Sequence, residues 1–238
     1  MSLTTRRDAG TIERGFIQMA GVIDTQEARL LIDCGVPFLG FPLVLGYHKE
    51  DLTVDQATKI VAELHDRATF VLITYLNTAD EVIALCQRLG TRVVQLHGDI
   101  ALAELRKLRD AAPQLTVIKS LIVGRSDEAA LRAQVNVTAD LVDAYITDTF
   151  DPTTGATGAT GKVHNWAVSH DLVALSPKPV IVAGGLTPDN VAAAIAATSP
   201  AGVDVHTGVE GPDGRKQADL VRDFVDAARR AFGATTAT

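Results

Sequence analysis

Glycines follow two apolar runs in the last third of the chain, and at these positions the backbone could bind a phosphate group. The first run leads into Ala-Gly-Gly-Leu-Thr-Pro-Asp-Asn at 183–190, and the second into His-Thr-Gly-Val-Glu at 206–210. Glycine lets an oxyanion approach backbone N–H groups closely, and the start of a following helix adds a favourable dipole. A single glycine pair is more often an ordinary turn. Two such sites together predict phosphate binding by Gly184, Gly185 and Gly208.

Titratable side chains also stand at the ends of apolar runs, where they could transfer protons. They are Asp24, His48, His97 and His206. A histidine, or a carboxylate with a shifted pKa, acts as acid or base when it reaches the substrate. Each also has a simpler interpretation. Asp24 is placed to cap a helix, and His48 lies in a charged loop exposed to solvent.

Lys119 is a lysine inside an apolar run, Leu-Thr-Val-Ile-Lys-Ser-Leu-Ile-Val at 115–123. A desolvated lysine can form a Schiff base with a sugar carbonyl, which is the chemistry of a lyase or an aldolase. A structural or substrate-binding lysine is the other interpretation, and the sequence pattern alone leaves both open.

Short apolar runs alternate with longer helical patterns along nearly the whole chain, an order typical of parallel α/β folds. The predicted strands are 16–22, 37–43, 69–76, 92–98, 115–123, 141–148, 179–185 and 202–208. The predicted helices are 25–35, 54–66, 80–90, 101–111, 127–137, 165–175, 187–197 and 215–232. Eight such units favour a closed (β/α)₈ TIM barrel, whose working residues lie at the carboxyl ends of the strands.

The length of the chain fits a single barrel domain. It has 238 residues, and one α/β barrel commonly needs about 200–250. We expect residues 1–238 to form this one domain, with about 1–13 and 233–238 as flexible ends.

Composition and charge exclude several classes of function. The net charge is −7 and the basic residues are scattered, so no nucleic-acid surface is predicted. No apolar run reaches the ~20 residues that cross a membrane, and the start of the chain lacks the apolar stretch of a secretory signal. Cys34 and Cys86 have neither metal-ligand spacing nor a disulfide pattern, so we predict no metal site and a reducing cytoplasm.

Four segments resemble one known family, the phosphoribosylanthranilate isomerases of tryptophan biosynthesis. They are VVQLHGD at 93–99, TGATGKVHNW at 157–166, PVIVAGGLTPDNVAAAI at 179–195 and GVDVHTGVEGPDGRKQADLVRDFV at 202–225. With the strand and helix spacing, the resemblance runs from about Gly15 to Ala231.

The resemblance implies a TIM barrel that catalyses an Amadori rearrangement of a phosphorylated aminoaldose to an aminoketose. It implies a small phosphosugar substrate and no cofactor. Family members occur as monomers and as dimers, so a homodimer is one of two states to expect. The aspartate that serves the family as general acid matches Asp148. The substrate-binding residues implied are Gln18, His97, Lys119, Lys162 and Asp204.

Two positions depart from the family pattern. The family's Lys-Ile-Cys-Gly, whose cysteine is the general base, is Gln18-Met19-Ala20-Gly21 in this chain. An arginine that follows the second strand of the family and holds the anthranilate carboxylate is absent from PLVLGYHKEDL at 42–52. The group attached to the sugar is therefore left open.

The missing cysteine leaves the general base to be found. Cys34 ends the first helix, near the opposite rim of the barrel, so we predict Asp24 or His48 as the replacement. Two alternatives are a phosphosugar lyase that uses Lys119 and a phosphosugar-binding protein without catalysis.

Overall fold

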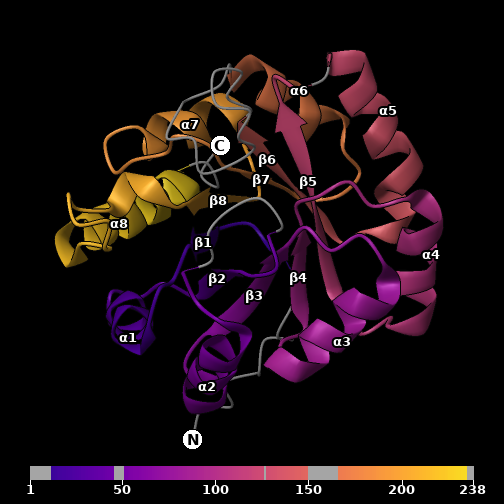
Figure 1. Cartoon of the computed structure of the whole chain (residues 1–238). Helices are drawn as coiled ribbons and strands as arrows, with labels where there is room; N and C mark the ends of the chain where they lie inside the picture. The colour runs from indigo at the N-terminus through magenta and orange to yellow at the C-terminus, as the bar shows by residue number, and fades with distance from the viewer. Residues whose placement is uncertain (1–11, 46–50, 126, 150–165, 235–238) are drawn as a thin grey trace, which may run out of the picture.

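The chain folds into a closed barrel of eight parallel strands, which lies at the centre of the molecule in Figure 1. A computed structural model describes residues 12–45, 51–125, 127–149 and 166–234. Each strand pairs with the next along the sequence, and β8 pairs with β1 to close the ring. The strands are β1 (Phe16–Ala20), β2 (Phe38–Pro42), β3 (Thr69–Thr74), β4 (Val93–Leu96), β5 (Thr116–Val123), β6 (Ala144–Thr149), β7 (Val180–Val182) and β8 (Gly202–Val205).

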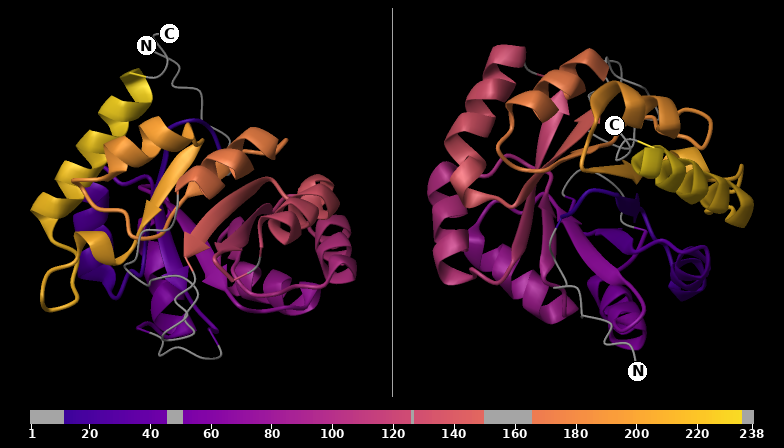
Figure 2. Two further views of the ribbon diagram at one scale, coloured as in Figure 1. Left: turned by 90° about the horizontal axis from the view of Figure 1, so that it is seen from above. Right: turned by 180° about the vertical axis from the view of Figure 1, so that it is seen from behind.

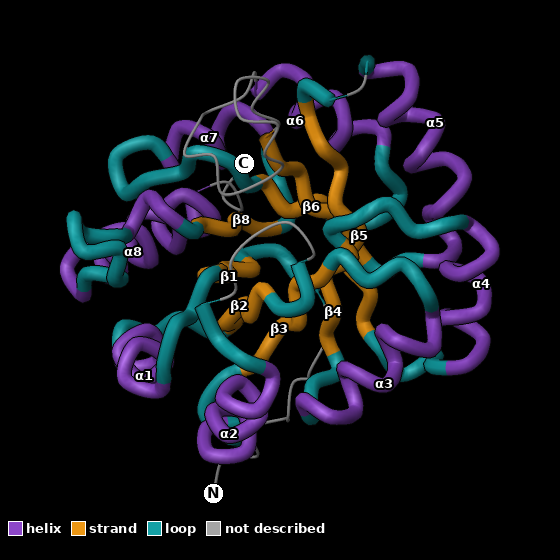
Figure 3. Tube along the Cα trace, in the orientation of Figure 1, coloured by secondary structure: helices purple, strands orange, loops and turns teal. Residues whose placement is uncertain are grey.

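In the described part of the chain, one α-helix lies between each pair of consecutive strands, and a last one follows β8. The helices are α1 (Thr25–Asp33), α2 (Val54–Leu64), α3 (Ala79–Leu89), α4 (Leu102–Ala111), α5 (Glu128–Thr138), α6 (Trp166–Leu175), α7 (Val191–Thr198) and α8 (Ala218–Ala234). Two short 3₁₀ helices are η1 (Ala139–Leu141) and η2 (Thr207–Val209). The tube in Figure 3 and the two further views in Figure 2 show the helices outside the ring of strands. The predicted (β/α)₈ barrel is confirmed.

Alternate residues of each strand face two different cores. Phe16 and Ala20 of β1 belong to a cluster that fills the inside of the barrel. Ile17 and Met19 belong to the larger cluster between the strands and the helices. Because side chains alternate along a strand, Gln18 faces inward with its two interior neighbours. Strands buried on both faces are apolar almost throughout, which is why the sequence shows them as continuous runs.

The ends of several elements differ from the predicted ones. Gly35 and Gly90 end their helices with φ angles of +83° and +76°, as glycine at a helix end predicts. α7 starts at Val191, because residues 187–190 form a turn in which Asn190 accepts a hydrogen bond from the Thr187 backbone N–H at 2.8 Å. The predicted start at 187 was therefore too early. Most strands also end a few residues before their predicted ends.

The packed structure reaches slightly beyond the expected limits of the domain. Ile12 is buried in the interior cluster, and α8 continues to Ala234. Among the described residues, no helix is long and apolar enough to cross a membrane.

Candidate active site

Polar side chains gather inside the barrel near the carboxyl ends of the strands. Gln18, Gln95, His97, Asp148 and Asp204 are all buried there. Four of them alternate along their strands with residues of the outer core, and His97 continues the same alternation one residue beyond β4, so all five face the interior. A buried polar layer at this end is where TIM-barrel enzymes carry out their chemistry.

Asp148 is the penultimate residue of β6. Its Oδ1 accepts a hydrogen bond from the Thr149 backbone N–H at 2.7 Å. Burial raises the pKa of Asp148 to about 7, against the effect of the Thr149 hydrogen bond. A carboxyl group with this pKa is protonated for part of the time at neutral pH and can donate a proton.

His97 lies beside Asp148, just beyond the end of β4. Its Nδ1 is 3.1 Å from the Ser120 hydroxyl and 4.0 Å from Asp148 Oδ2. The ring of Tyr75 meets the His97 ring edge-on, with centroids 4.9 Å apart. These contacts, from β5, β6 and the residue that follows β3, fix the orientation of the imidazole next to the Asp148 carboxyl.

Gln18 and Asp204 face each other across the pairing of β1 with β8. The Gln18 amide donates to Gln95 Oε1 at 2.9 Å. Gln18 Oε1 and Asp204 Oδ1 are buried and have no hydrogen-bond partner among the described residues. Burial raises the pKa of Asp204 to about 7, with a further rise from Asp148, while Gln18 and Lys216 oppose the shift. Two unsatisfied oxygens in one place indicate a binding site for a polar ligand.

Ala20 occupies the end of β1 and brings no titratable group to the site. Gly21 follows it with φ +77°, and a Cβ at Gly21 would lie 2.0 Å from His206 Nε2. The imidazole of His206 therefore lies directly over the end of β1. Burial, with Lys216 as the second cause, lowers the pKa of His206 to about 3, so the ring is neutral at physiological pH.

A buried ion pair supports this corner of the barrel. Lys216 Nζ lies 2.6 Å from Glu210 Oε1, and its side chain has no exposed surface. The same Glu210 oxygen lies 3.5 Å from His206 Nε2. The backbone N–H of Lys216 donates to Glu27 of α1 at 2.9 Å. Sequence reasoning missed Lys216, Glu210 and Glu27, although an acid and a base six residues apart in a loop were a signal for the first two.

The predicted phosphate-binding glycines lie in the loops after β7 and β8. Gly184 and Gly185 have φ angles of +96° and +64°, which favour glycine. A Cβ at Gly208 would lie 1.8 Å from the Leu186 carbonyl oxygen, so the two loops touch at a point that only glycine fits. Gly208 belongs to η2, whose backbone turns directly after β8. The structure thus brings the predicted glycines into two adjoining loops.

Asp24, one of the two predicted replacement bases, does not belong to the polar layer. Asp24 caps α1 through the Glu27 backbone N–H at 2.8 Å and pairs with Arg215 at 2.6 Å. Burial acts to raise the pKa of Asp24, but these two contacts outweigh it and the pKa is lowered. Asp24 therefore holds α1 to the loop after β8. His48 and Lys162 lie outside the described residues.

Lys119 faces the helices rather than the barrel interior, because its neighbours Ile118 and Ser120 face inward. Its ammonium donates to the carbonyl oxygens of Gly98 at 2.9 Å, Ser120 at 3.3 Å and Leu96 at 3.4 Å. Burial lowers the pKa of Lys119 to about 8. These contacts tie the loop after β4 to β5 and leave the ammonium away from the interior.

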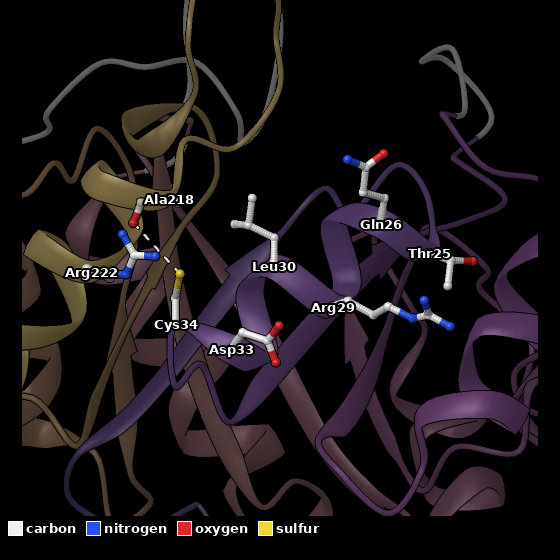
Figure 4. Close-up of a pocket in the computed structure, with 8 residues that line it drawn as sticks. All are labelled: Thr25, Gln26, Arg29, Leu30, Asp33, Cys34, Ala218 and Arg222. Atoms are coloured by element: carbon white, nitrogen blue, oxygen red, sulfur yellow. Dashed lines mark hydrogen bonds between the residues drawn. The ribbon is translucent and has the colours of Figure 1, made fainter.

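Cys34 lies outside the barrel, in a groove between α1 and α8 that Figure 4 shows. Its thiol approaches the Ala218 carbonyl oxygen at 3.7 Å, and burial raises its pKa. Helices of a TIM barrel run against the strands, so the end of α1 lies at the rim opposite the polar layer.

We expect Cys34→Ala to leave kcat/KM within about twofold of wild type, because surface substitutions remote from a site change little. Steady-state kinetics of the two proteins would measure this. A tenfold loss of kcat/KM would contradict this placement and make the Cys34 thiol a candidate base.

The described residues contain no group of three or more histidine, cysteine or acidic side chains that could hold a metal ion.

Comparison with known proteins shows to which family the chain is related. Residues 17–227 match the family model described as N-(5'-phosphoribosyl)anthranilate (PRA) isomerase. The chain belongs to the PRA isomerase family. The match covers every strand except the first residue of β1, and it includes all the polar residues of the interior layer.

Individual relatives agree with the family model. The isomerase 2 of Methanosarcina mazei is 36% identical over 91% of this chain and 95% of its own length. The PRA isomerase of Haloferax volcanii is 41% identical over 76% of this chain and 77% of its own. The crystal structure of the Thermotoga maritima PRA isomerase matches with a TM-score of 0.76 and 25% identity, over 90% of this chain and 98% of that one.

Proposed function

We propose that the protein isomerises N-(5'-phosphoribosyl)anthranilate or a close analogue, in an Amadori rearrangement within tryptophan biosynthesis. The observation that carries this proposal is Asp148, a buried carboxylic acid with a pKa of about 7, in the interior of a barrel of the PRA isomerase family. Opening the sugar ring needs a proton on the ring oxygen, and an acid with a pKa near the working pH supplies it best.

The other residues of the site have roles that follow from their placement. Gly184, Gly185 and Gly208 would bind the phosphate through the two adjoining loops. Gln18 and Asp204 have unsatisfied oxygens that can bind sugar hydroxyl groups. His97 lies within 4.0 Å of the acid and would contact the sugar beside it. No metal or organic cofactor is needed for this chemistry.

The lyase alternative is not favoured, because Lys119 directs its ammonium to three backbone carbonyl oxygens outside the barrel interior. A Schiff base requires a free amine that reaches the substrate carbonyl. For Lys119 we instead propose a positioning role for the loop that follows His97.

The proposal is tested by adding freshly made phosphoribosylanthranilate to the purified protein and following the loss of its fluorescence. We expect turnover in proportion to protein concentration, with the aminoketose phosphate as the product identified by chromatography. A mock preparation from the same host, deleted for its own isomerase, is the control. Binding without turnover at high protein concentration would favour the non-catalytic alternative and contradict the proposal.

We also propose that the protein is cytoplasmic and that it is either a monomer or a homodimer. Cys34 and Cys86 are free thiols, which fits a reducing cytoplasm. Sedimentation equilibrium of the purified protein would decide between a monomer and a homodimer.

A further inference from the structure

The end of β1 lacks a base, and the two strands that pair with it are the described elements nearest to the position that a base there would occupy. Ala20 has only a methyl group, and its strand pairs with β2 and β8. On β2, the neighbour of Ala20 is Gly40. On β8, Asp204 pairs with Gln18, one inward-facing position before Ala20. Of the two neighbouring strands, β8 is therefore the one that presents a carboxylate to this part of the interior.

Resting on the proposed function, we propose that Asp204 is the general base of the reaction, in place of a residue at position 20. Its carboxyl group is buried, and Oδ1 has no hydrogen-bond partner among the described residues. A buried carboxylate oxygen without a donor is costly, and it is explained if a substrate occupies that place. Asp204 and Asp148 thus flank the interior from β8 and β6.

Electrostatics fits two carboxyl groups with separate tasks. Burial and then Asp148 of β6 raise the pKa of Asp204, whereas Gln18 and Lys216 lower it. Among the described residues, the imidazoles at the same end of the barrel are those of His97 and His206. Since each carboxyl group has a pKa of about 7, the pair holds on average about one proton near neutral pH. One group can then act as acid while the other acts as base.

The chemical steps balance for this pair. Asp148 gives its proton to the ring oxygen as the bond from that oxygen to C1 breaks, which leaves a protonated imine at C1. Asp204 then takes the proton from C2; the C–H electrons form the C1–C2 double bond, and the imine π electrons become the nitrogen lone pair. Finally the 2-hydroxyl proton passes to Asp148, the C2–O double bond forms, and Asp204 returns its proton to C1. Both carboxyl groups regain their starting states.

His206 is the rival base, because it lies over Gly21 at the end of β1. Its Nε2 is turned toward Glu210 at 3.5 Å, a pair that belongs to the loop after β8. A strongly lowered pKa makes its ring a weak proton acceptor, whereas a base with a pKa near 7 matches the task. The structure thus favours the carboxylate over the imidazole.

Three variants test the inference. Asp204→Asn is expected to lower kcat by at least about 100-fold, while a product analogue still binds within about fivefold of wild type. Asp80→Asn makes the same chemical change on the exposed surface of α3 and should retain full activity. In an Ala20→Cys/Asp204→Asn double variant, the new thiol should raise kcat at least tenfold above that of Asp204→Asn. Ala20→Ser in the same background should restore none.

Two further readouts separate a base from a merely structural residue. With deuterium at C2 of the substrate, Asp204→Asn should show a larger isotope effect than wild type, because removal of this proton becomes fully rate-limiting. The rate of wild type should fall below about pH 7 as Asp204 is protonated. In the Ala20→Cys/Asp204→Asn double variant, the pH below which the rate falls should rise toward the pKa of a thiol, about 8.5.

The outcomes separate this inference from the proposed function. If wild type turns over the substrate and Asp204→Asn keeps kcat within threefold, while His206→Gln loses it, the inference is wrong and the proposed function stands. A loss in Asp204→Asn without thiol rescue and without a change in isotope effect would also overturn the inference. A wild-type protein without any turnover would overturn both.

Discussion

Replacing Asp148 with asparagine is expected to lower kcat by about 10³-fold, since a positioned general acid contributes roughly 10²- to 10⁴-fold to a rate. Asparagine has the same shape, and its carbonyl oxygen can still accept the hydrogen bond from the Thr149 N–H that Oδ1 accepts at 2.7 Å. It cannot release a proton to the ring oxygen. The measurement is single-turnover kinetics of both proteins on phosphoribosylanthranilate, with binding of a product analogue measured alongside.

The same role for Asp148 predicts the direction in which kcat changes with pH. Because the pKa of Asp148 is raised to about 7, its acid form is lost as the pH rises through that value, and kcat of wild type should fall above about pH 7. In Asp148→Asn the residual rate should lack this fall. A variant that keeps more than a tenth of the wild-type kcat, with the same fall at high pH, would show that another group is the acid.

Stability provides a control for the same variant. A carboxyl group with a folded-state pKa above its unfolded value makes the protein less stable as the pH rises from about 4 to about 7. Asp148→Asn removes this loss, so at pH 8 its free energy of unfolding should exceed that of wild type by up to about 4 kcal/mol. If the variant is more stable than wild type and yet inactive, its inactivity comes from the missing proton donor and not from unfolding.

Much of the fold and one part of the site could be predicted from the sequence, because both depend on local patterns. The strands and helices follow from periods of apolar residues, and the end of β6 follows from the run that stops at Asp148. The glycines after β7 and β8 are local signals as well. Their approach at Leu186 depends on two loops meeting, so only the structure could show why Gly208 has no room for a side chain.

Other features depend on which face of a strand a residue occupies. In a barrel both faces are apolar, so the run 115–123 does not tell whether Lys119 faces the interior or the helices. The hydrogen bond from Gln18 to Gln95 joins residues 77 positions apart. Asp24 is titratable and follows a strand, yet its partner Arg215 is supplied by the other end of the chain. These assignments required the closed ring in three dimensions.

The largest loss of stability is expected from Lys216→Met. The Lys216 side chain is fully buried and lies 2.6 Å from Glu210 Oε1. Removing one partner of a buried ion pair leaves the other charge without compensation, at a cost of about 3–5 kcal/mol. Glu210 retains some exposure, so we expect about 3 kcal/mol, or a fall in Tm of roughly 6–12 °C for a chain of this size. Thermal and urea unfolding of the two proteins would measure it.

The double variant Glu210→Gln/Lys216→Met separates the lost pair from the lost packing. Without the carboxylate, the methionine fills an apolar space, so we expect the double variant to recover most of the loss, a coupling of at least about 1 kcal/mol. His206 gives an independent signal. Burial and, second to it, the positive charge of Lys216 lower the pKa of His206, so in Lys216→Met the imidazole should titrate at a higher pH by NMR. Additive losses with an unchanged His206 titration would contradict this account. The predicted result would show that one buried lysine holds the end of β1 and adds to the lowering of the His206 pKa by burial, which leaves proton transfer to the two aspartates.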